Sequence, residues 1–325
     1  MKAMIPVGGK GTRLRPHTLT TPKPLITVAG KPILFHIIDR ILPYKPEEVI
    51  LVIPPDGENI FKAVKEGFPH IKVSYAVQEQ PLGLGHAIRV GLDLVGDSEL
   101  LIVLGDTIID ITLREEDFNN DFMGVKKVDN PSRYGLAVID QDRNVLQVVE
   151  KPNHFVSDLA ISGIYFFKNP SVLRDALNYI INNDIKTKGE YQLTDAIQYM
   201  LNSNYRPKAI YIEEWCDCGT VESLLSTNKY LLHKHSIIKE FPNALIIPPC
   251  YIGDGAEISN SLIGPYVSIG NDAKIFNSII QNSIINERAE VENIIITSSI
   301  IGKDSYLKGS AKVVNLGDSS EMVES

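Results

Sequence analysis

The sequence has no long apolar run and little cysteine. No apolar stretch approaches the ~20 residues of a membrane-spanning helix, and the N-terminus reaches a glycine pair without the apolar segment of a signal peptide. We therefore expect a cytoplasmic protein that does not use a membrane as a partner. Cys216, Cys218 and Cys250 are odd in number and lack the spacing of a zinc site. This pattern favours reduced, buried thiols.

The sequence also lacks an excess of basic residues. It has 40 Asp and Glu against 32 Lys and Arg, a formal net charge of −8. A chain without a positive field has nothing to hold a polyanionic backbone, so nucleic acid polymers are excluded as expected partners. All seven histidines lie at or before His235. Histidine chemistry is therefore excluded from the last quarter of the chain.

Length and patterning predict two domains. With 325 residues, of which 44% are hydrophobic, the chain is long enough for two buried cores. Up to about residue 240, short β-branched runs alternate with segments of helical spacing, which predicts an α/β domain with a mixed, doubly wound, Rossmann-like sheet and helices on both faces. The expected strands are 2–7, 49–53, 73–77, 100–104, 121–128, 136–139, 145–149 and 161–167, and the expected helices are 33–42, 85–94, 171–181 and 191–201.

From about Ile246 the pattern changes to an aliphatic residue every six positions. The runs are Ile252 and Ile258; Ile263, Ile269 and Ile275; Ile279, Ile285 and Val291; and Ile295, Ile301, Leu307 and Val313. This period is typical of a left-handed parallel β-helix that stacks these side chains inside. We predict a border near residue 240, giving domains 1–240 and 241–325, with a connection over 233–243 and a polar tail over 316–325.

A glycine-rich turn with three cations follows the first expected strand: Gly8-Gly9-Lys10-Gly11-Thr12-Arg13-Leu14-Arg15. Glycines allow backbone N–H groups to approach phosphate oxygens closely, and arginine adds a charge-assisted fork. The spacing fits neither the P-loop nor the dinucleotide fingerprint. A nucleoside triphosphate is the expected guest.

This turn, followed by Pro22-Lys23-Pro24-Leu25, resembles the signature of the sugar nucleotidylyltransferases. Within the family it is similar to the glucose-1-phosphate thymidylyltransferases and their uridylyl counterparts, and Pro6-Val7 is reminiscent of the uridylyl type, so the base is open. The resemblance implies that Arg13 binds the phosphates and that Lys23 lies near the α-phosphorus. It also implies a loop that wraps the triphosphate, formed by Gly8, Gly9, Gly11 and Thr12.

A second glycine-rich turn lies in Gln78-Glu79-Gln80-Pro81-Leu82-Gly83-Leu84-Gly85-His86. It joins a strand end to a helix start, where backbone groups and an amide can read the edge of a base. The resemblance implies that Gln80 and Gly83 recognise a pyrimidine. His86 has no partner in the sequence, and we interpret it as a histidine on a helix face without a role.

Two aspartates are candidate metal ligands. Asp106 follows a buried apolar strand, the usual place for ligand sites in open α/β sheets, and Asp217 stands beside a glycine turn. Mg²⁺ needs one or two carboxylates together with phosphate oxygens and water. The resemblance gives Asp106 and Asp217 the role of Mg²⁺ ligands.

Further motifs occur in the family's order. The resemblance assigns Glu150 to the hexose, Lys151 to its phosphate and Gly135 to a hydroxyl through its backbone, and it adds Glu190 as a sugar contact. A carboxylate can accept from vicinal hydroxyls, while an adjacent lysine that points to another side can bind the phosphate. Asp195 fits either a sugar contact or a helix-stabilising role.

The resemblance thus implies an enzyme that transfers a nucleotidyl group from dTTP or UTP to a hexose 1-phosphate, with glucose 1-phosphate favoured. Its expected catalytic residues are Arg13, Lys23, Asp106, Lys151 and Asp217. Two alternatives stay open: a regulatory paralogue without turnover, and a hexapeptide-repeat acyltransferase, against which the lack of histidine after His235 counts. Flat β-helix faces can pack on one another, so we expect a homo-oligomer.

Overall fold

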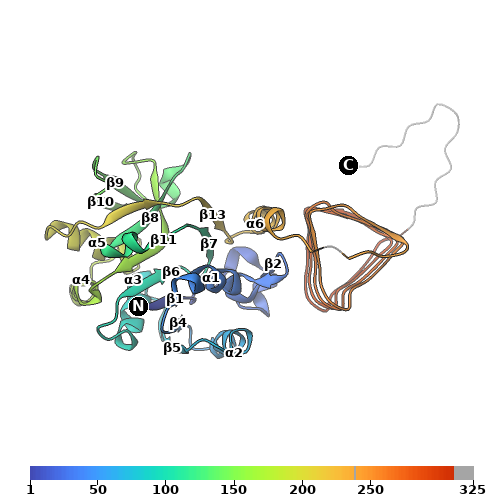
Figure 1. Ribbon diagram of the computed structural model, residues 1–325, viewed down its shortest axis with the longest axis horizontal. Coiled ribbons are helices and arrows are strands. Elements are labelled where there is room, and N and C mark those ends of the chain that lie inside the picture. Colours follow the sequence, from blue (N-terminus) through green and yellow to red (C-terminus); the bar gives the residue numbers. More distant parts are fainter. Residues whose placement is uncertain (238, 311–325) are drawn as a thin grey trace. The chain divides into compact units, whose positions relative to one another are not determined.

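The computed structural model describes residues 1–237 and 239–310 and divides into two compact units (Figure 1). The first comprises Met1–Thr27 and Lys31–Leu224; the second comprises Val28–Gly30 and the chain from Leu225 onward. A segment near the N-terminus therefore belongs to the second unit. Among the described residues, no helix is both long and apolar enough to cross a membrane.

The first unit is built on a mixed sheet of nine strands. Its main path is β10-β9-β11-β6-β1-β4-β5, and β8 links β11 to β12. The strands β6, β1, β4 and β5 run parallel, whereas β11 is antiparallel to β6. The bounds are β1 Lys2–Pro6, β4 Val49–Ile53, β5 Val73–Val77, β6 Leu100–Val103, β8 Phe122–Lys127, β9 Gly135–Ile139, β10 Val145–Glu150, β11 Leu159–Phe167 and β12 Lys208–Tyr211.

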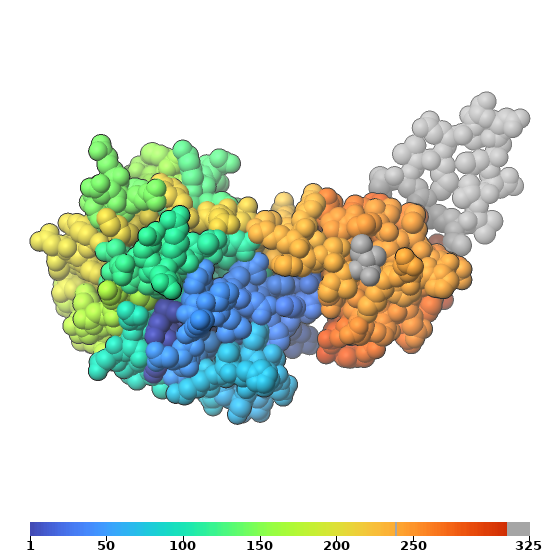
Figure 2. All heavy atoms as spheres, in the orientation of Figure 1, coloured from blue at the N-terminus to red at the C-terminus, as the bar shows by residue number. Residues whose placement is uncertain are grey.

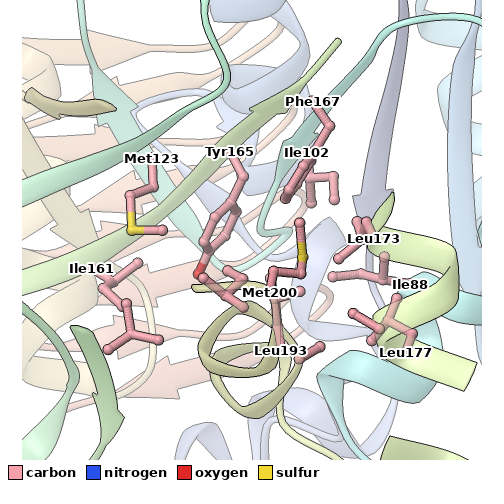
Figure 3. Packing of buried hydrophobic residues seen from close by; sticks show 14 of the residues in the cluster. Ile88, Ile102, Met123, Ile161, Tyr165, Phe167, Leu173, Leu177, Leu193 and Met200 are labelled. Atoms are coloured by element: carbon pink, nitrogen blue, oxygen red, sulfur yellow. The ribbon is translucent and has the colours of Figure 1, made fainter. Parts of the chain in front are cut away.

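Both faces of this sheet are covered, because every residue of β4, β6 and β11 is buried although successive side chains point to opposite faces. On one face, side chains of three helices pack with the sheet in a single cluster, in which Ile88, Leu173 and Leu193 lie close to Ile102 and Tyr165 (Figure 3). The α-helices of both units, among the described residues, are α1 Ile33–Ile41, α2 Glu58–Gly67, α3 Leu84–Gly91, α4 Pro170–Asn182, α5 Leu193–Asn202 and α6 Val221–Lys234.

The fold class is confirmed, and the expected strands and helices occur within a few residues of their predicted bounds. The sequence pattern did not predict α2, because only Ile60 and Val64 of that helix are buried and its apolar stripe is narrow. It also did not predict that a helix, α6, would run into the expected connection as far as Lys234. A separate two-stranded antiparallel sheet, β7 Thr107–Asp110 with β13 Glu214–Asp217, was missed as well.

The second unit carries the predicted left-handed parallel β-helix, whose three parallel sheets of four strands form a triangular column (Figure 1). Figure 2 shows the outer surface of the same segment as spheres, coloured from orange to red. The sheets are β14 Ala244–Ile246, β17 Ser261–Ile263, β20 Ile279–Gln281 and β23 Ile295–Thr297; β15 Cys250–Ile252, β18 Val267–Ile269, β21 Ile284–Ile285 and β24 Ile300–Ile301; and β16 Glu257–Ser259, β19 Lys274–Phe276, β22 Glu290–Glu292 and β25 Tyr306–Lys308.

The predicted internal stack is wrong at two positions. Ile279 and Ile295 are 38% and 75% exposed, while Ile280 is 0% exposed and Ile296 packs against the core. The pairing aligns Ile263 with Ile280, 17 residues further on, but Ile269 with Ile285, only 16 residues further on. The step from Ile280 to Ile285 is therefore five residues instead of six, so a six-residue period counted back from Ile285 selects Ile279. Neighbouring residues of a strand face opposite sides, so Ile279 points outward. The predicted position Val313 and the predicted tail lie outside the described residues.

The three faces of the column differ. The helix α6 contacts the face that carries β18: buried Asn228 accepts from the hydroxyl of Ser268 at 2.6 Å and donates to the carbonyl of Tyr266 at 3.2 Å. The same Asn228 side chain accepts from the backbone N–H of Ala29 at 2.9 Å, which fixes the N-terminal segment to this unit. The face of β19 and β22 is charged, with Lys274 paired to Glu290 at 3.1 Å.

The third face, formed by β14, β17, β20 and β23, is aliphatic and exposed. Leu245, Leu262, Ile279 and Ile295 align across the four strands and point outward. A shallow hollow of about 1010 Å³ runs along them, and none of the described residues that line it is charged. We call these four residues the aliphatic ladder.

Candidate active site

The predicted phosphate loop leaves the carboxyl end of β1, the edge at which ligands bind in open α/β sheets. Gly11 has φ +59°, a conformation that favours glycine, and its carbonyl accepts from the Thr18 hydroxyl at 2.8 Å. Leu14 is fully buried and anchors the loop, while Thr12 and Arg13 are exposed. The glycine turn thus holds its backbone at the surface while its end is fixed in the core.

Lys23 reaches the same edge from beneath the loop. Its side chain is only 7% exposed, and its ammonium lies 2.9 Å from the carboxylate of Asp106. A Cβ on Gly11 would lie 3.0 Å from the Cβ of Lys23, so the lysine stem packs directly against the loop. The structure therefore brings Lys23 and Asp106 together, with the cation shielded and the acid half exposed.

The small sheet of β7 and β13 brings the two aspartates together. Asp106 immediately precedes β7, and Asp217 at the end of β13 is paired with Thr107. The backbone N–H of Cys218 also donates to the carbonyl of Asp106 at 3.2 Å. Asp106 and Asp217, 111 positions apart, thus come together through a strand pairing that the sequence pattern does not predict.

Arg13 completes this group. A Cβ on Gly219 would lie 2.8 Å from a guanidinium nitrogen of Arg13 and 2.9 Å from a carboxylate oxygen of Asp217. Glycine at this position therefore leaves room for both charged groups on either side of it. None of the three cysteines forms a disulfide and all three are buried, and burial raises the pKa of Cys216 to about 12. That value leaves Cys216 protonated at neutral pH, and the nearby carboxylates of Glu214 and Asp110 favour the same form.

The donor set fits a hard divalent cation that keeps ligands from elsewhere. Among the described residues, no cluster of three or more His, Cys, Asp and Glu could hold an ion by itself. Asp106 and Asp217 supply two carboxylates at one place, the number with which Mg²⁺ is usually held beside substrate phosphates. The expected pair of ligands is therefore compatible with such an ion.

The second glycine turn presents Gln78 rather than Gln80. Gln78 is 7% exposed, and its amide nitrogen lies 3.1 Å from the carbonyl of Gly83, whereas Gln80 is exposed. A Cβ on Gly8 would lie 3.2 Å from the amide oxygen of Gln78. Gln78 lines a cavity of about 530 Å³ that is also lined by Gly8, Gly9 and Lys23. The side chain that lies between the two glycine turns is thus Gln78, whereas the resemblance implies a role for Gln80.

The predicted sugar residues form a second group. Glu150 pairs with Gly135 across β10 and β9, and its carboxylate accepts from the Thr194 hydroxyl at 3.0 Å. Lys151 does not point to another side as expected: its ammonium lies 3.2 Å from Glu150. Lys151 has φ +40°, which breaks the strand alternation and turns its side chain toward its neighbour.

The segment before α5 joins this group to the second glycine turn. Lys188 donates to the carbonyl of Lys151 at 3.2 Å, and the backbone N–H of Tyr191 donates to the carbonyl of Leu82 at 2.9 Å. Glu190 lies beside Gly83, since a Cβ on Gly83 would be 2.9 Å from the Cβ of Glu190. The structure therefore places Glu190 next to a predicted base-binding residue.

Asp195 lies in the first turn of α5, where an acid favours the helix, and accepts from the Thr187 hydroxyl at 3.0 Å. Burial, with a smaller contribution from Glu150, raises the pKa of Asp195. Its other oxygen is buried and has no hydrogen-bond partner among the described residues.

Sequence reasoning missed Gln78 and Thr194. Gln78 is the first residue after β5, so the strand-end rule that selected Asp106 could have selected it too. Thr194 carried no signal, because its contact with Glu150 joins residues 44 positions apart.

A family model described as Nucleotidyl transferase matches residues 2–234. The chain is 31% identical to a glucose-1-phosphate thymidylyltransferase of Streptomyces antibioticus over 80% of each protein. It is 32% identical to the low-salt glycan biosynthesis nucleotidyltransferase Agl11 of Haloferax volcanii, over 74% of this chain and 68% of the relative. The bifunctional protein GlmU of Methanocaldococcus jannaschii is 34% identical over 72% of this chain, which spans 55% of that relative.

Solved structures of similar fold carry related names. A putative glucose-1-phosphate thymidylyltransferase from Bacillus anthracis is 26% identical with a TM-score of 0.62, over 74% of this chain and 98% of the other. A UDP-glucose pyrophosphorylase complexed with UDP-glucose has a TM-score of 0.61 at 23% identity, over 72% of this chain and 99% of the other, and shares the fold. The chain therefore belongs to the nucleotidyl transferase family and is a sugar-1-phosphate nucleotidyltransferase.

Proposed function

We propose that the chain transfers a nucleotidyl group from UTP or dTTP to a hexose 1-phosphate, with glucose 1-phosphate favoured, and releases pyrophosphate. The observation that carries the proposal is the meeting of Lys23, Arg13, Asp106 and Asp217 at the carboxyl ends of β1 and β6. The names of the thymidylyltransferase and pyrophosphorylase relatives support this choice of base and sugar.

The reaction is an in-line displacement. An oxygen of the sugar phosphate forms a bond to the α-phosphorus of the nucleotide, the bond from that phosphorus to the β-phosphate oxygen breaks, and pyrophosphate leaves with the electron pair. The nucleophile is already anionic, so no side-chain base is needed. Catalysis then rests on positioning and on charge neutralisation.

Each residue has a role in this scheme. The backbone of Gly8, Gly9, Gly11 and Thr12 binds the triphosphate, Arg13 neutralises the leaving pyrophosphate, and Lys23 faces the transferring group. Asp106 and Asp217 hold Mg²⁺, which neutralises phosphate charge when bound. Glu150, Gly135 and Glu190 bind the hexose.

Two adjustments follow from the geometry. Lys151 binds the sugar phosphate after exchanging its contact with Glu150 for the phosphate, since its side chain is half exposed and free to move. Gln78 takes the base-reading role expected of Gln80, because it lies between Gly8 and Gly83 while Gln80 faces solvent. Gly83 keeps its expected place beside the base.

The test is pyrophosphate release with Mg²⁺, glucose 1-phosphate and each of dTTP, UTP, CTP, GTP and ATP in turn. We expect release with UTP or dTTP. Failure with every nucleotide and with a panel of other sugar phosphates would favour a regulatory paralogue. The retained cations and acids argue against that paralogue, and the lack of histidine after His235 argues against acyl transfer.

We also propose that residues 1–240 act as the catalytic domain and that residues 241–325 mediate self-association through the aliphatic ladder. Of the three faces of the column, one contacts α6 and one is charged, so the third is the face left for a partner. A second copy fits best, because its matching face is equally uncharged and its strands have the same spacing of about 4.8 Å.

Size-exclusion chromatography with light scattering tests this surface. The double variant Ile279→Glu with Ile295→Glu should elute as a smaller species than the wild type. The interface would then bury the introduced carboxylates of one chain against the same carboxylates of the second chain. Ser259→Glu, on the charged face, is the matched control and should keep the wild-type mass. A monomeric wild type, or an unchanged mass in the double variant, would contradict the proposal.

A further inference from the structure

The amide of Gln78 is held by two acceptors. Its nitrogen lies 3.1 Å from the carbonyl of Gly83 and 3.1 Å from Nδ1 of His86, in the first turn of α3. A backbone carbonyl can only accept, so the end of the amide beside Gly83 must be the NH₂ group. This contact fixes the orientation of the amide on chemical grounds, independently of how its oxygen and nitrogen are assigned.

The amide of Gln78 also fixes the tautomer of His86. Because the NH₂ group donates one hydrogen to Gly83 and directs the other at Nδ1, that nitrogen must accept, and the ring proton lies on Nε2. Burial lowers the pKa of His86, which favours the neutral ring that accepts. A flipped amide would place its oxygen against the Gly83 carbonyl, which can only accept, and would require the His86 proton to move to Nδ1; with the proton on Nε2, both contacts oppose the flip.

The free end of the amide is therefore its oxygen. This oxygen is directed toward Gly8, 3.2 Å from where a Cβ on that glycine would be, in the wall of the cavity beside the phosphate loop. Neither hydrogen of the amide is left for a ligand. The site thus offers the base an acceptor from Gln78 and no donor from it.

We propose that His86 is a positioning residue that holds the Gln78 amide with its oxygen toward the nucleotide, and thereby selects a base with an N–H donor on its pairing edge. This inference rests on the proposed function and deepens it. Uracil and thymine carry such a donor at N3, whereas cytosine presents an acceptor there. Acceptor facing acceptor leaves a polar group unpaired, which is costly in a buried site.

The experiment compares wild type, His86→Phe and His86→Gln. We measure kcat/KM of pyrophosphate release for UTP and CTP, and the affinity of both nucleotides without sugar phosphate by calorimetry. In His86→Phe one anchor is lost and the amide can turn, so the preference for UTP over CTP should fall by about tenfold or more, mainly through KM. His86→Gln keeps an acceptor in its side chain and should restore the preference to within about threefold of wild type.

Three outcomes would overturn the inference: a wild type that uses or binds CTP as well as UTP, a His86→Phe variant with an unchanged preference, or a His86→Gln variant no better than His86→Phe. A fall in activity with both nucleotides and an unchanged ratio would indicate a merely structural histidine, with the same consequence. A wild type that binds UTP over CTP, loses this preference in His86→Phe and yet releases no pyrophosphate would refute the proposed function and support the inference.

Discussion

The ammonium of Lys23 lies 2.9 Å from a carboxylate oxygen of Asp106, and the two residues stand 83 positions apart in the sequence. The lysine is shielded and the aspartate is half exposed, so the pair presents its acid to the open side of the site. A cation held in this way is ready to act on a phosphate that arrives from that side, since shielding from water strengthens its interaction with the anion.

Replacing Lys23 should therefore impair catalysis more than folding. For Lys23→Met we expect kcat/KM of pyrophosphate release to fall by about 10²-fold or more, because one preorganised charge is lost. The melting temperature should change little, because the exposed oxygen of Asp106 can be hydrated. Lys62→Met, at a surface position outside the site, serves as the control. Turnover within about twofold of wild type in Lys23→Met would remove this lysine from the proposed machinery.

Asp217→Asn should leave the fold intact and abolish most turnover. The amide keeps the shape of the side chain but lacks the charge that a divalent cation requires, so we expect kcat to drop by about 10²-fold or more at fixed Mg²⁺. Asp97→Asn, an exposed aspartate without a role in the site, is the matched control. Full activity of Asp217→Asn would refute the metal assignment, and the circular dichroism spectrum would show whether the fold is retained.

Gly11→Ala should destabilise the first unit, whereas Gly9→Ala should not. At Gly11, φ is +59° and a Cβ would meet Thr18 at 2.9 Å and Lys23 at 3.0 Å, while a Cβ on Gly9 has nothing within 4 Å. The left-handed conformation alone costs a side chain about 1–2 kcal/mol. Urea unfolding of both variants measures the difference, and equal midpoints would mean that the loop relaxes without cost.

Two neighbouring isoleucines test the register of the β-helix. Ile280 is fully buried and Ile279 is 38% exposed, so Ile280→Ala should lower the free energy of unfolding by about 2–5 kcal/mol and Ile279→Ala by much less. If the sequence-based stack were right, the order of the two effects would be reversed. The comparison is made on the full chain by chemical denaturation.

Much of the fold was accessible from the sequence, because its signals are local. The strand Val49–Ile53 and the six-residue period are read from neighbouring residues, and both occur in the structure. The prediction of the inward-facing residues failed where the spacing changes: rungs of 17 residues become rungs of 16, and a six-residue period counted back from Ile285 then selects Ile279 instead of Ile280.

The candidate site divides in the same way. The glycine turn and Asp106 were found because they follow strands that are visible in the sequence. The meeting of Asp106 with Asp217 requires the pairing of β7 with β13, and the return of Lys151 toward Glu150 requires a single left-handed residue. Such features depend on long-range pairing or on one backbone angle, which residue types alone do not specify.

Asn228 gives the repeat column an unusual kind of attachment. Its side-chain oxygen accepts hydrogen bonds from the backbone N–H of Ala29 and from the hydroxyl of Ser268, two residues that lie far apart in the sequence. The β-helix therefore cannot be exchanged for another one without changing the residues that attach it. A chimera that replaced it by the repeats of another protein would also have to transplant Val28–Gly30 and the inner side of α6, because a buried amide without its matching donors would be left behind.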